Sequence, residues 1–194
     1  MRWRRFHFLA VLALLLAGCD GAGGDAAARL NALIDGLTRT VFTASPDLAT
    51  YYAVDEALAG EGYNARLPDY GPEAEEKRRL AYARYATGLQ AIPRERLRPE
   101  AQADLDIVRA IMASALGARD LAYGTIDLLS FTAHTPYIVS QISGPHIAIP
   151  HLMAAQQPVA SPAQAHDYIA RLQGFGTMFQ GINAKIVADA RAGL

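Results

Sequence analysis

The sequence predicts an all-α protein, folded as an irregular array of helices. Three observations lead to this class. Apolar residues recur at i, i+3, i+4 and i+7 in every strongly patterned segment, which is the period of an amphipathic helix. Proline or a capping residue stands where several of these segments begin. No alternation of polar and apolar residues is long enough to predict a sheet.

Residues 1–18 have the layout of a bacterial lipoprotein signal peptide. Three arginines precede a short apolar run, and Leu16-Ala17-Gly18 stands directly before Cys19, the only cysteine. The run suits the apolar region of a secretory signal, about 7–15 residues, and is shorter than the ~20 residues that span a membrane. We expect cleavage before Cys19 and lipid on its thiol. The protein would then be anchored in the cell envelope, facing the periplasm or the outside; an ordinary, non-lipidated signal peptide is the alternative.

The segment 19–28 is rich in Gly, Asp and Ala, and is expected to be a flexible tether. The remaining residues, 29–194, suffice for one helical domain. Cleavage removes three of the 18 basic residues and none of the 19 acidic ones, which leaves a net charge of −4. No nucleic-acid partner is expected, because such a surface would carry clustered positive charge.

The first helix of the domain is expected over residues 30–41 and ends before Ser45-Pro46. Its apolar positions are Leu30, Leu33, Ile34, Leu37 and Val41. Irregular chain with one short helix follows over 47–70. Gly71-Pro72 opens a second helix that runs to about residue 91, and the charged run 73–79 is expected to be its solvated face.

Pro99 opens a third helix. The last helix starts at Ser161-Pro162-Ala163-Gln164, which combines a capping box with proline at the first helical position. Gly174 and Gly176 weaken its middle and predict a close helix crossing or a bend. The helix reaches Leu194 with no closing element after it, so we expect a domain that is incomplete at its C-terminus.

Residues 128–166 contain no Asp, Glu, Lys or Arg, and Pro136, Pro145, Pro150 and Pro158 exclude one long helix. An uncharged, irregular segment of this length is expected to be covered by other chain. The predicted helices are too few to cover it and one another. The sequence therefore predicts a missing partner surface, either a second subunit or more polypeptide.

No catalytic or metal-binding residue is predicted. Of the histidines that remain after cleavage, His146 and His151 are five residues apart, so they do not share a helix face as in His-Glu-x-x-His. No glutamate follows Glu100, so no such motif can lie near them. A nucleophile elbow and a phosphate-binding loop are also absent from the sequence.

Two stretches carry a resemblance to a known family. The first runs from Thr135 to His146 and contains Tyr137, Gln141, Ser143 and Gly144; the second contains Tyr168, Arg171 and Leu172. They resemble the Tyr-x-x-x-Gln-x-Ser-Gly segment and the Tyr-Leu-x-Arg-Leu helix in the N-terminal half of the bacterial domain of unknown function 885 family. Asp47, after Ser45-Pro46, is similar to the family's early Ser-Pro-Glu segment.

The resemblance implies a larger helical fold of a kind regarded as zinc metallopeptidase. The family's metal-binding motif lies in the C-terminal half, so zinc is expected only in a full-length form and this chain would need no cofactor and be inert alone. Its partners would be the membrane, through Cys19, and the missing half or another subunit. The residues expected to form one wall of the substrate cleft are His134, Tyr137, Gln141, Gly144 and His146.

A second hypothesis belongs to a different class of protein. The chain could be a self-contained helical lipoprotein that binds a partner or a small ligand through the uncharged segment 128–166. A cooperative, monomeric unfolding transition would favour this hypothesis, whereas aggregation of the isolated chain would favour the peptidase fragment.

Overall fold

The computed structural model describes residues 4–129 and 133–194, and side chains from residue 23 onward. Arg2 of the predicted signal peptide and residues 130–132 of the uncharged segment lie outside the described residues. The fold is all-α, as predicted. The helices are α1 (Arg4–Ala44), α2 (Pro46–Tyr52), α3 (Glu56–Ala59), α4 (Pro72–Gln90), α5 (Pro99–Leu116), α6 (Pro145–Ala155), α7 (Pro162–Gln173) and α8 (Phe175–Arg191), with 3-10 turns η1 (Tyr63–Ala65) and η2 (Arg94–Arg96).

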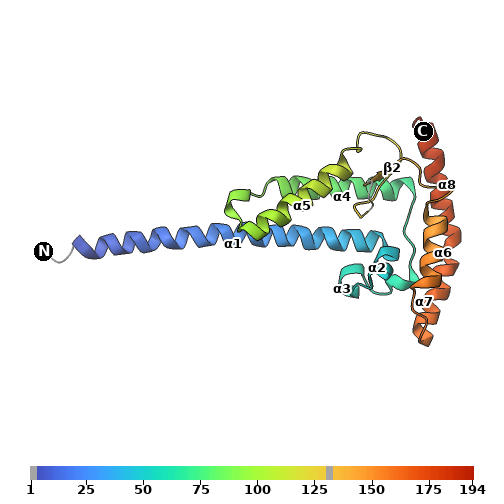
Figure 1. Ribbon diagram of the computed structural model, residues 1–194, viewed down its shortest axis with the longest axis horizontal. Coiled ribbons are helices and arrows are strands. Elements are labelled where there is room, and N and C mark those ends of the chain that lie inside the picture. The colour runs from blue at the N-terminus through green and yellow to red at the C-terminus, as the bar shows by residue number, and fades with distance from the viewer. Residues whose placement is uncertain (1–3, 130–132) are drawn as a thin grey trace.

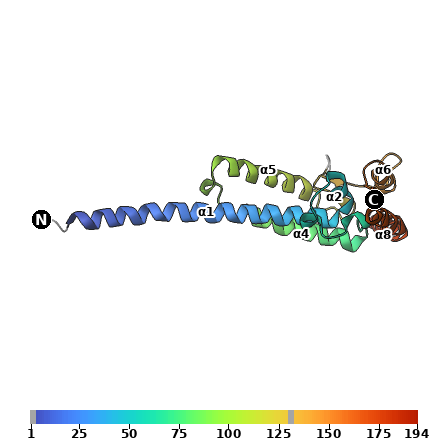
Figure 2. The ribbon, with the colours of Figure 1, turned by 90° about the horizontal axis from the view of Figure 1, so that it is seen from below.

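The helices form two groups that lie crosswise (Figure 1). The long helix α1 lies beside α4 and α5, and a view turned by 90° shows α5 and α4 on opposite sides of it (Figure 2). Helices α6, α7 and α8 stack across the end of this first group, near the C-terminal end of α1. A short antiparallel pair, β1 (Thr125–Ile126) and β2 (His134–Thr135), lies between the groups. Strands of two residues are too short to show an alternating pattern in the sequence.

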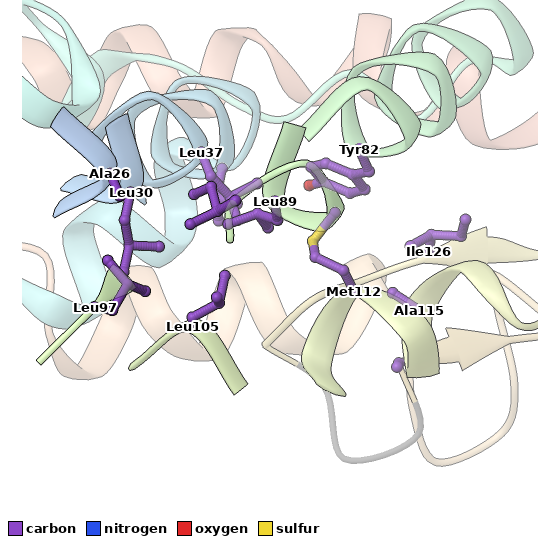
Figure 3. Close-up of a cluster of buried hydrophobic side chains, with 13 residues drawn as sticks. Ala26, Leu30, Leu37, Tyr82, Leu89, Leu97, Leu105, Met112, Ala115 and Ile126 are labelled. Carbon is purple, nitrogen blue, oxygen red and sulfur yellow. The ribbon is translucent and has the colours of Figure 1, made fainter. Parts of the chain in front are cut away.

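The largest hydrophobic core joins α1, α4 and α5 (Figure 3). Leu30 and Leu37 of α1 meet Leu89 of α4, and Leu105 and Met112 of α5 close the cluster. Burial of such side chains stabilises the fold by about 1.5–3 kcal/mol each. The predicted helical stripes of these three segments therefore face one another.

The predicted helix starts at Pro72, Pro99 and Pro162 are confirmed. At α7 the Ser161 hydroxyl accepts a hydrogen bond from the Gln164 backbone N–H at 3.2 Å. The Gln164 side chain accepts one from the backbone N–H of Ala160 at 2.8 Å. The first bond satisfies an amide that the first helical turn leaves without a partner, and the second holds the residue before the cap against this turn.

The predicted last helix is broken in two at Gly174, which separates α7 from α8. A Cβ atom at this glycine would lie 3.1 Å from Leu67 Cδ1. Because Gly174 has no side chain, Leu67 in the segment before α4 can lie close to it. The bend at this position was predicted from the glycine.

The predicted flexible tether over 19–28 needs correction, because the structure includes these residues in α1. Ala26 is buried in the main core, and a Cβ atom on Gly23 would lie 3.2 Å from the carbonyl oxygen of Arg96 in η2. Alanine has the highest helix propensity, and contact with η2 and the core favours continuation of α1 through Gly23–Ala28.

A buried guanidinium joins α7 to α2 and to the chain around η1. Arg171 on α7 is fully buried and donates to the carbonyl oxygen of Arg66 at 2.9 Å and to Gln157 Oε1 at 2.9 Å. One terminal nitrogen donates to Thr50 Oγ1 and to the carbonyl oxygen of Tyr63, both at 2.8 Å. Burial lowers the pKa of Arg171 to about 10, so the group is still charged at neutral pH.

We expect Arg171→Met to lower the free energy of unfolding by about 3 kcal/mol or more. Each buried acceptor left without its donor costs about 1–3 kcal/mol, and this substitution removes the donor of several at once. Urea denaturation followed by far-UV circular dichroism measures the change. Arg84→Met, at an exposed position of α4, is the matched control and should change stability by less than about 0.5 kcal/mol. Equal effects of the two substitutions would contradict the anchoring role.

Candidate functional site

A cavity of about 360 Å³ lies where the end of α1, the start of α2, α4, the β1–β2 pair and the segment before α6 meet. Apolar side chains form much of its lining, and several polar groups converge on it. The residues used in the argument below are Asp47, Tyr70, Arg78, Asp127, Tyr137 and Gly144, and the lining also includes the hydroxyl-bearing residues Ser45, Tyr82, Thr125, Thr135 and Ser143. An apolar cavity with a few convergent polar groups is the usual form of a small-ligand site.

Asp47 is the most unusual group in the cavity lining. Pro46 is the first residue of α2, so Asp47 lies in the first helical turn. Its Oδ1 is buried and has no hydrogen-bond partner among the residues that the structure describes. Burial raises the pKa of this carboxyl above its ordinary value, against the opposing effects of nearby backbone N–H groups and of Arg171.

Arg78 on α4 belongs to the cavity lining, and two of its nitrogens already have acceptors. Its Nη2 donates to Glu75 Oε2 at 2.8 Å, and its Nη1 donates to the carbonyl oxygen of Asp69 at 2.9 Å. Glu75 also accepts from Arg79 Nε and from the backbone N–H of Ile126, both at 3.0 Å. The pairing of Glu75 with Arg79 is as predicted, but Glu75 is buried, which corrects the expectation of a solvated face there. This carboxylate fixes β1 against α4.

Two of the three tyrosines in the cavity lining, Tyr70 and Tyr82, are held in their neutral form. Burial raises the pKa of Tyr70 well above its ordinary value, and nearby Asp47 adds to the effect. Burial also raises the pKa of Tyr82 to about 12. Both hydroxyls therefore keep their protons at neutral pH and can donate hydrogen bonds.

Two residues of the predicted cleft wall, Tyr137 and Gly144, lie together in the cavity lining. Tyr137 is 58% exposed, so its ring stands at the edge of the cavity. Gly144 precedes α6 with φ of 132°, and a Cβ atom there would lie 2.8 Å from the carbonyl oxygen of Ile138. Only glycine adopts this conformation in so little space.

The other three predicted wall residues lie outside the cavity lining. His134 is in β2, and its Nε2 is 3.2 Å from the carbonyl oxygen of Tyr123, so this ring has a local partner. Gln141 is exposed in the segment before α6. His146 is half-buried on α6, and its buried Nδ1 has no hydrogen-bond partner among the described residues. His146 nevertheless lies beside Gly144, where a Cβ atom on the glycine would be 3.0 Å from the histidine Nδ1.

Sequence reasoning did not assign Asp47, Tyr70, Arg78 or Asp127 to the site. Asp47 carried one usable signal, because it follows Ser-Pro at a helix start and matches a family segment. The others stand in segments with ordinary composition. They meet only because α4 and the β1–β2 pair pack beside the start of α2.

Large apolar side chains are exposed along the uncharged segment and on helices α7 and α8, and Tyr137 among them also belongs to the cavity lining; together they are called the apolar surface. Within the part of the chain that the structure describes, the uncharged segment is only partly covered: Ile149 and Met153 are buried, whereas Ile142 is 89% exposed. The other large exposed apolar residues of this surface are Tyr137, Ile147, Val159, Ile169, Leu172, Phe179, Ile186 and Val187. Contiguous exposed apolar residues usually mark an interaction surface.

Within residues 23–129 and 133–194, no three or more His, Cys, Asp or Glu side chains are grouped in a way that could hold a metal ion. No helical stretch within these two ranges is both long and apolar enough to cross a membrane.

Fold and cavity together define an all-α protein with a partly polar cavity at the junction of two helix groups. The chain belongs to the family described as "Bacterial protein of unknown function (DUF885)", whose model matches residues 46–194. This confirms the family resemblance found in the sequence.

A solved structure, "the putative lipoprotein from Colwellia psychrerythraea", is similar to this chain with a TM-score of 0.78 and 26% sequence identity. The similarity covers 86% of this chain but only 28% of that one, so the chain spans less than a third of the relative's length. No curated protein sequence matches the chain.

We expect Asp47→Asn to raise the free energy of unfolding by about 0.5–2 kcal/mol at neutral pH, because it removes a buried charge with an unpartnered oxygen. A raised pKa in the folded state means that the wild-type protein loses stability as pH rises from 3.8 through that raised pKa. The difference in the free energy of unfolding between variant and wild type should therefore be largest at neutral pH and should decrease toward pH 4. Urea titrations at several pH values measure it.

Glu75→Gln is the matched control for this prediction. Glu75 is a buried carboxylate whose oxygens are all engaged, so its neutralisation should lower the free energy of unfolding by about 2 kcal/mol or more at neutral pH. Loss of stability in both variants would show that Asp47 is an ordinary structural carboxylate.

Proposed function

We propose that this chain is the N-terminal helical portion of an exported, lipid-anchored, zinc-dependent peptidase. It would form one wall of the substrate cleft and be inert by itself. The observation that carries the proposal is the cavity that opens beside an uncovered apolar surface on α6–α8. Family membership and the much greater length of the similar solved structure support it.

The described residues do not fit a catalytic zinc ion. Such a site uses three protein ligands, commonly His, Glu or Cys, and the described residues hold no group of this kind. No catalytic step is therefore assigned to this chain. Its part in the proposed enzyme is to bind and position substrate through the cavity lining.

The apolar surface of α6–α8 would receive the remaining helical polypeptide of the enzyme. Ile169 of α7 and Phe179 and Ile186 of α8 are exposed at helical spacing, as expected of a face that packs against further helices. The test that follows distinguishes polypeptide that is continuous with this chain from a separate subunit.

The test compares this chain with the product of the reading frame extended past the codon for Leu194. The chain alone should contain no stoichiometric zinc and cleave no peptide, whereas the extended protein should bind zinc and hydrolyse peptides. Metal analysis and a fluorogenic peptide library measure these properties. A stop codon directly after Leu194, with monomeric chain that unfolds cooperatively, would overturn the proposal.

A second experiment tests the lipid anchor. Cys19→Ser should move the protein from the membrane fraction to the soluble periplasmic or secreted fraction, because the residue has no thiol to acylate. Fractionation and labelling with radioactive palmitate measure the change, and Asp25→Asn is the control that should remain membrane-bound. Membrane association and labelling that persist in the Cys19→Ser variant would contradict lipidation at this residue.

The alternative is a self-contained helical lipoprotein that binds a small ligand. The cavity favours this alternative, because this chain supplies the cavity lining. The cavity volume of about 360 Å³ also lies within the range of small-molecule sites. This reading requires neither zinc nor further polypeptide. The comparison of chain and extended protein described above separates the two functions.

A further inference from the structure

Asp47 has the properties of a binding group that lacks its ligand. Its buried Oδ1 has no hydrogen-bond partner among the described residues, although a buried carboxylate oxygen normally has one. The neighbouring cation does not supply it, because Arg171 donates to carbonyl oxygens, to Thr50 and to Gln157. Because Asp47 belongs to the cavity lining, a hydrogen-bond donor bound in the cavity could supply this partner.

The charges around the cavity favour a cation as this donor. Asp47 and Asp127 both belong to the lining, and Arg78 is the lining residue with a positive charge. Glu75, which lies outside the lining, pairs with Arg78 at 2.8 Å and also with Arg79. Nearby Arg171 offsets part of the charge of Asp47. The lining itself nevertheless holds two carboxylates and one guanidinium, which favours an ammonium group over an anion beside Asp47.

The remaining lining selects for an apolar body on the ligand. Val41, Leu48, Tyr82, Ile126 and Ile138 surround the space beside Asp47. A volume of about 360 Å³ is at the lower end for ligand sites, which suits one apolar residue or a molecule of similar size.

We propose that the cavity binds the primary ammonium group of an amphipathic ligand, with Asp47 as its receptor and the apolar lining around the attached side chain. The free N-terminus of a peptide with an apolar first residue has this chemistry, and so does a simple alkylamine. The part of the inference that names a peptide N-terminus as substrate rests on the proposed peptidase function. The binding itself needs neither zinc nor further polypeptide.

The experiment measures the binding of three probes to this chain by isothermal titration calorimetry and NMR. Leucine amide carries the ammonium group, the apolar side chain and an amide; N-acetyl-leucine amide lacks the ammonium group; isopentylamine lacks the amide. Leucine amide should bind at least tenfold more tightly than its acetylated form. Binding of isopentylamine equal to that of leucine amide would identify a general amine site, whereas weaker binding would identify a peptide N-terminus.

Asp47→Asn should weaken the binding of leucine amide at least tenfold, and this variant is expected to fold because it removes a destabilising charge. Asp35→Asn, exposed on α1, is the control and should leave binding unchanged. Equal binding of both leucine derivatives, unchanged binding by Asp47→Asn, or no binding of leucine amide at millimolar concentration would each overturn the inference. Because the assay requires no hydrolysis, its outcome is independent of whether an extended protein proves to be a peptidase.

Discussion

The arrangement of the site depends on one constraint, the burial of the Arg171 guanidinium without a carboxylate partner. A buried cation is stable only if its N–H groups all find acceptors, and these come from α2, from η1 and from Gln157 after α6. Those acceptors hold the start of α2 against α7, which places Asp47 in the cavity lining. Because a charged group at this position demands several partners at once, it fixes segments that are more than 100 residues apart in the chain.

Two buried carboxylates nearby illustrate opposite solutions to the cost of burying a charge. Glu75 is paired with Arg78 and Arg79 and accepts a backbone N–H from β1, so it joins α4 to the strand pair. Asp47 has an oxygen with no such partner in the described chain, and burial raises its pKa. Asp47 thus lowers the stability of the fold, whereas the carboxylate of Glu75 has all its hydrogen-bond partners. A buried group that destabilises the protein in this way is typical of a residue retained for its function.

The cavity and the apolar surface share a residue, so polypeptide that covers the surface would also affect the cavity. Tyr137 lines the cavity and belongs to the exposed apolar surface. A polypeptide packed on α6–α8 would therefore border the cavity as well as cover this surface. The similar solved structure is more than three times longer than the part aligned here, in keeping with such an addition.

The sequence by itself determined the all-α class, the helix starts at Pro72, Pro99 and Pro162, and the family, because local propensity, capping and periodicity act within a few residues. It also indicated the break near Gly174. Tertiary packing alone decided that Gly23–Ala28 continue α1, that Glu75 is buried, and that Asp47 meets Tyr137 and Gly144 across the cavity. These features depend on contacts between residues far apart in the chain, and no local pattern encodes which segments will meet. The cavity is therefore a property of the packing between the two groups of helices.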